Sequence, residues 1–242
     1  MDNSNNKASV HDILRSQKVM LYLVISSLML TLILMGFLPS VYDAIIGISE
    51  VNLLIHSHAI LFLSWIFFYT LQAILPALGK IEQHKKLGKL GLPLAITLTI
   101  NGLYVTYDRF SLRVENEQLE SARYFLLQPL TDMVVFPALV IAAFYYRNKS
   151  EVHKRLMLLA TLFLTIAAVV RIPYFPVPGS KLLLWLSPIV LAMVFDYHKK
   201  NIIHPTYIFG LVLFTIVYAR KPLILDTPAW QSFVNKMIAL VQ

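Results

Sequence analysis

Seven apolar stretches fill most of the 242-residue chain, and each is long enough, or nearly long enough, to cross a lipid bilayer as a helix. A helix needs about 20 mostly apolar residues to cross a hydrocarbon core of about 30 Å. Charged residues make up only 14% of the sequence, against about 25% in soluble domains. The sequence therefore predicts an all-α, polytopic transmembrane helix bundle.

The predicted spans cover residues 19–38, 52–78, 90–107, 124–146, 156–175, 182–197 and 205–219. The seventh is the weakest prediction because its apolar run is brief, which leaves a bundle of six spans as the alternative. The outer loop Asp108–Arg123 mixes both charge signs and is expected to be solvated. The whole chain, residues 1–242, is predicted to form a single integral membrane domain.

The basic residues lie mainly in the short connections between spans, and their distribution predicts the orientation of the chain. With the amino terminus inside, 13 of the 21 lysine and arginine residues face the cytoplasm. The first outer loop, residues 39–51, has none. Because cytoplasmic loops are enriched in lysine and arginine, we expect an N-in, C-out, multi-pass protein of the cytoplasmic (inner) membrane.

The end of the chain, residues 228–242, carries an amphipathic pattern. Apolar side chains recur there at helical spacing, at Trp230, Phe233, Val234, Met237, Ile238 and Val241. Such a face is typical of a helix that lies in the membrane interface, in contact with lipid. We therefore expect an interfacial helix after the last span.

The composition excludes several kinds of site. The chain has no cysteine, so disulfides, thiolate zinc sites, iron–sulfur clusters and covalently attached c-type haem are excluded. A haem or metal would have to be held by histidine, methionine or carboxylate. The net charge of +8 is explained by membrane orientation, and we expect no nucleic-acid partner.

Two turns of the sequence are alike. Residues 82–87 read EQHKKL and residues 151–156 read EVHKRL, so that His153 follows His84 by 69 positions (153 − 84). Each turn follows a span that runs inward and opens a span that runs back. This similarity predicts a tandem hairpin repeat, in which the second to fifth spans form a four-helix core. The alternative is that selection for positive charge produced two similar turns independently.

Four histidines, His84, His153, His198 and His204, lie near the cytoplasmic ends of predicted spans. Neutral imidazole is the usual axial ligand of b-type haem. Because His84 and His153 occupy equivalent positions of the repeat, they are the first candidates for a cofactor-binding pair. The alternative is that a histidine beside lysine or arginine at a helix end is solvated and binds nothing.

A second polar cluster is predicted at the outer side of the membrane. His56 and His58 open the second span and are the other candidate cofactor ligands. Counting the helical rise from the inner turns places Asp132 and Arg171 at similar depths, where they are expected to pair. The predicted substrate-binding pocket is lined by His56, His58, Asn101, Gln128, Asp132 and Arg171. The alternative is an interfacial histidine pair together with a structural ion pair.

These motifs resemble those of a known membrane-protein family. A span that opens with His56 or His58 carries Gln72 late in its length. The turn 84–88, HKKLG, follows, and the sequence HKRLM at 153–157 opens a span that ends in Arg171. Over residues 52–175 this pattern resembles the uncharacterised bacterial membrane proteins grouped as domain of unknown function 2306. The resemblance implies a fold and a membrane location without an established activity.

The four-helix core is also similar, more distantly, to the di-haem electron carriers of the ascorbate-reducing cytochrome b type. Those proteins hold haem between histidines of facing helices at both sides of the membrane. Here the fourth span has Gln128 and Asp132 where an outer histidine would be needed. The resemblance therefore implies at most one haem, at the inner face.

The leading functional hypothesis is a membrane protein whose polar intramembrane site holds b-type haem or a metal through histidine and transfers electrons. The second hypothesis is a cofactor-free transporter or binding protein for a small molecule, which uses Asp132, Arg171 and the outer histidines. A metal-dependent, seven-span membrane hydrolase is disfavoured because the seventh span has only His204 and no H-x-x-x-H pair. The sequence leaves open whether the protein is an enzyme.

Overall fold

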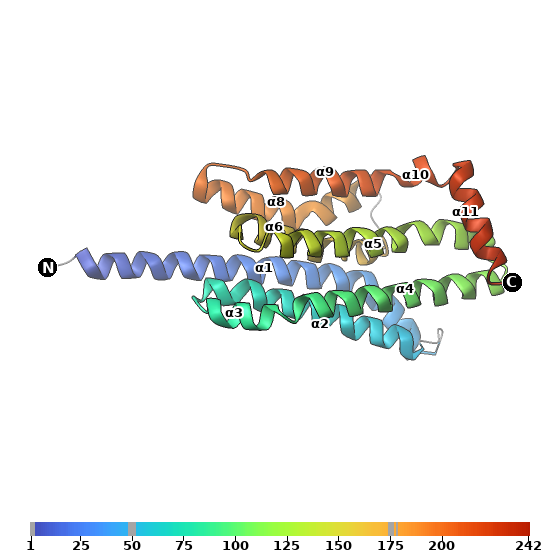
Figure 1. The fold of residues 1–242 in the computed structure, drawn as a ribbon, viewed down its shortest axis with the longest axis horizontal. Helices are drawn as coiled ribbons and strands as arrows, with labels where there is room; N and C mark the ends of the chain where they lie inside the picture. Colours follow the sequence, from blue (N-terminus) through green and yellow to red (C-terminus); the bar gives the residue numbers. More distant parts are fainter. Residues whose placement is uncertain (1–2, 48–51, 174–176, 178) are drawn as a thin grey trace.

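The computed structural model describes residues 3–47, 52–173, 177 and 179–242, with side chains described from Gln17 onward. These residues form a bundle of helices (Figure 1). The helices are α1 (Asn3–Ile45), α2 (Leu53–Ala77), α3 (Ile81–Gly88), α4 (Gly91–Glu115), α5 (Leu119–Tyr145), α6 (Ser150–Phe163), α7 (Ile166–Val169), α8 (Ser180–Lys200), α9 (Pro205–Ala219), α10 (Lys221–Ile224) and α11 (Pro228–Ala239). No strand occurs within the described ranges, so the all-α prediction is confirmed for them.

Among the residues that the structure describes, six helical segments are long and apolar enough to cross a membrane. They are Gln17–Ile45, Leu53–Ala77, Ile81–Glu115, Leu119–Tyr145, Ser150–Val169 and Ser180–Lys200. The predicted seventh span corresponds to α9, which has 15 residues. At 1.5 Å per residue α9 is about 22 Å long, short of a hydrocarbon core of about 30 Å. The six longer helices fit a multi-pass integral membrane protein.

The region predicted as a solvated loop, Asp108–Arg123, is mostly helical, and that prediction is wrong. Only the short connection 116–118 separates α4 from α5. The guanidinium of Arg113 lies 4.1 Å from the centre of the Phe125 ring, which helps to hold the two helix ends together. The helix predicted to end near Phe175 ends at Val169, and Phe175 itself lies outside the described residues.

The segment Ser150–Val169 lies at the centre of the bundle. In its apolar window 78% of the residues are buried, against 28–33% in the other five segments. Its first part, α6, contacts α2, α5, α8 and α9. A helix surrounded on all sides can be apolar all round, which explains the nearly unbroken apolar sequence from Leu156 to Val169. The core therefore extends beyond the four predicted helices, because α8 and α9 also close on α6.

The connections between helices gather at two ends of the bundle (Figure 1). We call the end with the α2–α3, α5–α6 and α8–α9 connections the basic-turn end. The opposite end, with the α4–α5 connection and the last helix, is called the α11 end. The amino-terminal part of α1 extends beyond the basic-turn end (Figure 1).

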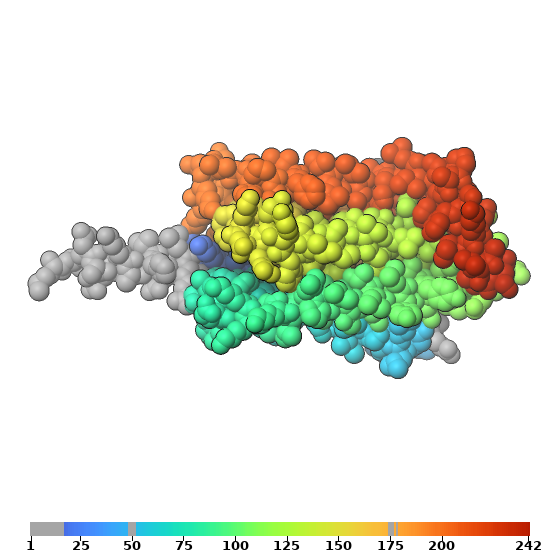
Figure 2. Space-filling model, in the orientation of Figure 1, coloured from blue at the N-terminus to red at the C-terminus, as the bar shows by residue number. Residues whose placement is uncertain are grey.

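The last helix, α11, lies across one end of the bundle (Figure 2). Its Val234 and Ile238 are buried in a small apolar cluster with Phe110 of α4 and Leu126 of α5. At these positions the predicted apolar face of α11 therefore packs against α4 and α5. The location of α11 in the membrane interface stays a prediction.

Two close contacts hold the outer helices against the centre of the bundle. At Gly36 of α1, a β-carbon would lie 2.2 Å from the carbonyl oxygen of Ala168 in α7, so glycine is required for this approach. Trp65 of α2 donates its Nε1–H to the Thr161 hydroxyl of α6 at 3.2 Å. Both side chains of this hydrogen bond are fully buried. The contacts fix α1 and α2 to the central segment.

Candidate functional site

The imidazole rings of His84 and His153 lie next to each other at the basic-turn end, with their planes nearly perpendicular. His84 lies on α3 and His153 on α6, and their ring centres are 6.3 Å apart with the ring planes at 79°. Both side chains are partly buried. The structure thus brings together the two histidines that occupy equivalent positions in the sequence repeat.

Each of these rings is anchored through Nδ1 to the helix that precedes it. Nδ1 of His84 lies 3.1 Å from the carbonyl oxygen of Gln72 in α2, and Nδ1 of His153 lies 2.8 Å from the carbonyl oxygen of Ala143 in α5. In both cases the histidine reaches back across a hairpin turn to the end of the preceding helix. The two turns therefore share the same local construction.

The side chain of Gln72 also holds His84. Its amide fits best with the nitrogen 3.1 Å from the His84 carbonyl oxygen and the oxygen 3.3 Å from the Gly88 amide nitrogen. This orientation places the amide nitrogen 2.7 Å from Nδ1 of His84. In this orientation the Gln72 amide donates to Nδ1, so the proton of the neutral His84 ring lies on Nε2. Gln72 positions His84 through its main chain and its side chain.

The other two histidines near this end do not join the pair. His204 precedes α9 as its N-cap, and its Nδ1 accepts the Thr206 amide N–H at 3.3 Å. His198 is exposed near the end of α8, beside the ring of Tyr197. The exposure of His198 agrees with the alternative of a solvated histidine, whereas His204 caps a helix, a role that the sequence analysis did not predict.

A buried ionic network lies next to the histidine pair, and it was missed in the sequence. The Arg155 side chain is 2% exposed and pairs with Asp196 of α8. Asp196 also accepts the hydroxyl of Tyr207 in α9 at 3.1 Å. A guanidinium nitrogen of Arg155 lies 2.9 Å from the Glu151 carboxylate on its own helix. The network therefore ties α6, which carries His153, to α8 and α9.

Towards the α11 end, the structure separates the two outer histidines. Nδ1 of His58 lies 2.8 Å from Oδ1 of Asn101 in α4, and the Asn101 amide donates to the Ser57 hydroxyl at 3.0 Å. His56 is exposed, and its Nδ1 lies 3.0 Å from the carbonyl oxygen of Asn52 on the same helix turn. His58 and Asn101 thus form one polar contact of the predicted pocket, and His56 lies outside it.

The predicted ion pair between Asp132 and Arg171 does not form. Asp132 is buried and accepts the side-chain amide of Gln128 at 2.7 Å, within α5. The Arg171 guanidinium lies 5.0 Å from the centre of the Phe37 ring on α1 and donates to the carbonyl oxygen of Ala167. Arg171 is directed to α1 because the short helix before it, α7, packs on α1.

Arg220, which the sequence analysis did not single out, contacts α5 at residues next to Asp132 in the helix. It is buried, and one guanidinium nitrogen donates to the Thr131 hydroxyl at 2.7 Å and lies 3.4 Å from Oε1 of Gln128. Burial lowers the pKa of Arg220, and the charge of Asp132 opposes this effect.

Sequence signals existed for both of the missed groups. Asp196 lies inside the predicted sixth span, so the rule that singles out Asp132 as an ionisable residue among apolar ones applies to it equally. Arg220 and Lys221 directly follow the seventh apolar run. Charges at the end of a span are usually assigned to the membrane interface, and this assignment hid the contact of Arg220 with α5.

The arrangement of possible metal-binding side chains was compared with what a metal centre needs. In the ranges covered by the structure, no group of three or more histidine, aspartate or glutamate side chains is placed to hold a metal ion. A closed zinc site takes four ligands. Comparison with protein-family models, curated proteins and solved structures finds no match.

Proposed function

We propose that the protein binds one b-type haem between His84 and His153 and passes single electrons through it. The observation that supports this proposal is the pair of neighbouring imidazoles from α3 and α6, whose ring centres are 6.3 Å apart with the ring planes at 79°. We also propose an N-in orientation in the cytoplasmic membrane, with α9 as a seventh, shorter span. This orientation is supported by the basic connections that gather at one end, and it places the haem at the cytoplasmic side.

The separation of the rings suits two axial ligands of one iron. A bond from a metal to an imidazole nitrogen is about 2 Å long, so an iron between two imidazoles separates the ring centres by about 6 Å. For the residues that the structure covers, the hydrogen bonds of both rings are made by Nδ1. Each ring therefore keeps Nε2 for the iron.

The anchoring of Nδ1 favours the tautomer that a ligand needs at His153. When its Nδ1–H donates to the carbonyl oxygen of Ala143, Nε2 carries a lone pair instead of a proton. At His84 the same tautomer requires Nδ1–H to donate to the Gln72 carbonyl oxygen in place of accepting from the Gln72 amide. A hydrogen bond of this kind orients the ring and raises its basicity as a ligand. His153 is thus prepared by a main-chain atom, whereas His84 also depends on the side chain of Gln72.

Haem suits this pair better than a bare metal ion does. The porphyrin supplies the in-plane ligands of its iron, so the protein provides only the two axial ones. A bare zinc ion would need further side-chain ligands, and the described residues offer none in a suitable group. When bound, haem supplies a one-electron couple, and the residues of the chain hold and orient the iron.

The proposal is tested by the absorbance spectrum of the full-length protein. Protein purified from haem-replete cells, or mixed with hemin after purification, is expected to show a Soret band that shifts on reduction with dithionite. His84→Ala and His153→Ala should each lose the spectrum of iron with two imidazole ligands, because each removes one axial ligand. His198→Ala removes an exposed histidine at the same end and should leave the spectrum unchanged.

The double variant His84→Ala/His153→Ala controls for haem that adheres to detergent or to apolar surfaces. The proposal requires the unaltered protein to bind hemin more tightly than this double variant. Equal affinity of the two, or a protein that is colourless under both conditions, would exclude haem binding at this pair.

A further inference from the structure

Gly102 of α4 marks a place where side chains of α2 and α5 come together. A β-carbon at Gly102 would lie 2.6 Å from Sδ of Met133 in α5 and 3.7 Å from Cε1 of His58 in α2. The sulfur and this ring carbon are therefore at most 6.3 Å apart (2.6 + 3.7). Gly102 is buried, as are Leu98 and Thr106, one turn before and after it. The contact thus lies on a face of α4 that is turned to the interior of the bundle.

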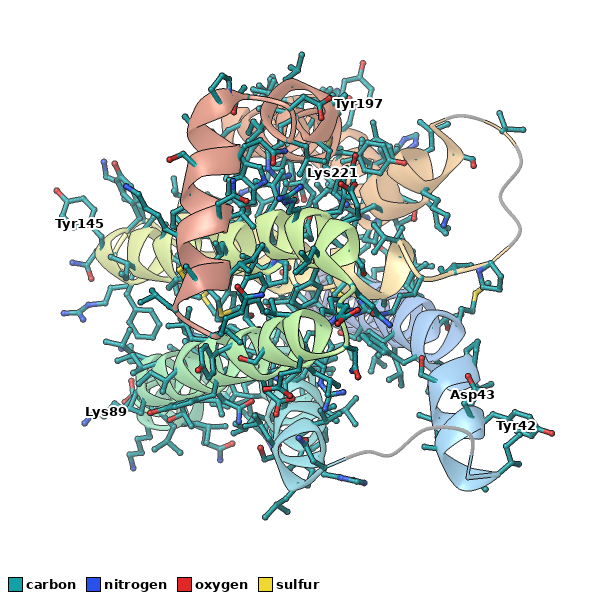
Figure 3. The ribbon with its side chains drawn as sticks, turned by 90° about the vertical axis from the view of Figure 1, so that its right-hand side faces the viewer. Tyr42, Asp43, Lys89, Tyr145, Tyr197 and Lys221 are labelled. Carbon is teal, nitrogen blue, oxygen red and sulfur yellow. The ribbon has the colours of Figure 1, made fainter. Side chains whose placement is uncertain are left out.

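The arrangement of the helices explains why these two side chains meet. Helix α4 contacts both α2 and α5 and lies between them in the view from the α11 end (Figure 3). His58 reaches α4 from one side and Met133 from the other. Because glycine has no side chain, the thioether can approach the main chain of α4 next to the imidazole.

A chain of hydrogen bonds fixes the proton of the His58 ring. The Ser57 hydroxyl donates to the carbonyl oxygen of Leu54 at 2.8 Å, so its oxygen accepts the Asn101 amide at 3.0 Å. This orientation turns Oδ1 of Asn101 towards Nδ1 of His58, at 2.8 Å. An amide oxygen can only accept, so Nδ1 of the ring carries the proton. Nε2 of His58 is left with a lone pair.

This arrangement is the one that a metal-binding histidine has. The ring nitrogen that does not bind the metal donates its N–H to an oxygen acceptor, which orients the ring and raises its basicity. Asn101 supplies that acceptor for His58. Nε2 belongs to the same ring edge as Cε1, the atom that approaches Gly102 and the sulfur of Met133.

We propose that Nε2 of His58 and Sδ of Met133 bind one Cu(I) ion. Thioether sulfur is a soft ligand that selects Cu(I), and imidazole also suits copper. Bonds of metal ions to sulfur and to imidazole nitrogen are about 2.3 Å and 2.0 Å long, so the two donors of one ion in line are about 4.3 Å apart. The contact at Gly102 allows this separation, and the flexible methionine side chain can adjust its sulfur to it.

The two donors favour Cu(I) over a divalent ion. A closed zinc site takes four ligands. Within the described part of the chain, no group of three histidine, aspartate or glutamate side chains could complete such a site here. Cu(I) accepts a low coordination number, so one histidine and one methionine can hold it without a third side chain.

The experiment measures Cu(I) binding to the full-length protein in detergent. Copper is kept reduced with ascorbate under anaerobic conditions, and the affinity is obtained by competition with the chromogenic chelator bicinchoninate. We expect one tightly bound Cu(I) per chain. It should also bind to the His84→Ala/His153→Ala variant, in which the two imidazoles of the proposed haem site are removed.

The copper X-ray absorption spectrum identifies the ligands. A sulfur neighbour at about 2.3 Å is expected beside the nitrogen neighbour. The chain has no cysteine, so a sulfur ligand from the protein must be a methionine. This signal distinguishes the proposed site from copper held by imidazoles alone.

Variants decide whether the named residues bind the ion. Met133→Leu should remove the sulfur neighbour, and His58→Gln should remove the imidazole. Each should weaken Cu(I) binding by more than about 100-fold, because losing a residue that only orients a ligand already costs about 10–100-fold. Asn101→Ala is such a change and should weaken binding about 10–100-fold. Gly102→Ala keeps both donors but displaces the sulfur, so it should also lower the affinity.

Two control variants remove the same chemical groups from exposed positions. Met20→Leu and His56→Gln each replace an exposed side chain and should leave the affinity unchanged. Met133→Leu nearly conserves side-chain volume, and its thermal unfolding midpoint without copper confirms that it folds.

The proposal is overturned if the copper spectrum of the unaltered protein contains no sulfur neighbour. It is also overturned if Met133→Leu binds Cu(I) as tightly as the unaltered protein, since Met133 would then only pack against Gly102. His58 and Met133 lie towards the opposite end of the bundle from the histidine pair, so the haem spectrum should not change in their variants. The two proposals therefore succeed or fail separately.

Discussion

Breaking the buried pair of Arg155 and Asp196 should be costly, because it leaves a charge without its partner, and Asp196→Asn tests the size of this cost. The Arg155 side chain is 2% exposed and that of Asp196 is 12% exposed, so both charges are largely removed from water. Removing one partner of a buried ion pair destabilises a protein by about 3–5 kcal/mol. Glu151 remains 2.9 Å from Arg155 in this variant and compensates in part. We therefore expect a loss near the lower limit, about 3 kcal/mol.

The loss can be measured as a lower midpoint of thermal unfolding. For a chain of this size, 1 kcal/mol corresponds to about 2–4 °C, so the midpoint should fall by about 6–12 °C. Trp65 and Trp185 are fully buried, and their fluorescence reports the loss of packing in detergent. Lys85→Met is the matched control because it breaks an exposed ion pair, in which the side chains of Lys85 and Glu82 are 66% and 79% exposed. Such exposed pairs contribute about 0–1 kcal/mol to stability.

A double variant separates the pair from its individual members. Arg155→Met/Asp196→Leu should recover a large part of the lost stability, because apolar replacement of a whole buried pair is often nearly neutral. Some loss should remain because the Tyr207 hydroxyl no longer has Asp196 as its acceptor. The reasoning fails if Asp196→Asn unfolds at the same temperature as the unaltered protein. It also fails if the double variant loses as much stability as Arg155→Met and Asp196→Leu lose when their separate losses are added.

Two further predictions concern helix contacts. Gly36→Ala should lower the unfolding midpoint, because its β-carbon would lie 2.2 Å from the carbonyl oxygen of Ala168. Gly88→Ala is the control, because its β-carbon would lie 3.5 Å from the nearest atom, and it should be neutral or slightly stabilising. If Gly36→Ala and Gly88→Ala unfold at the same temperature, the close crossing of α1 and α7 is contradicted. Trp65→Phe removes the hydrogen bond to Thr161 and should lower the free energy of unfolding by about 1 kcal/mol. Unfolding is monitored by circular dichroism. In a double-mutant cycle with Thr161→Val, strictly additive losses would show that the bond contributes nothing.

The helices of this protein could be predicted from the sequence because the membrane leaves few alternatives. Within lipid, every main-chain N–H and C=O group must be satisfied internally, and a helix does this within one segment. The same reasoning failed at residues 108–123, where mixed charge was interpreted as a loop. Helices α4 and α5 continue through this region because contacts such as that of Arg113 with Phe125 join them.

The proximity of candidate residues could be predicted only where the sequence relates two positions directly. The repeat pairs His84 with His153, and the centres of their rings lie 6.3 Å apart. Depth counting paired Asp132 with Arg171, but depth does not give the direction in which a helix turns its side chain. The segment that leads to Arg171 breaks between Phe163 and Ile166, and this break directs Arg171 to α1. Nothing in the apolar run itself indicates that break.

The anchoring of the two imidazoles has a mechanical consequence. Each ring is tied to its own helical hairpin, His84 to the end of α2 and His153 to the end of α5. A tilt of one hairpin against the other therefore changes the distance between the rings directly. Any ion or group that bridges them would fasten the two hairpins together, and its release would allow the basic-turn end to open.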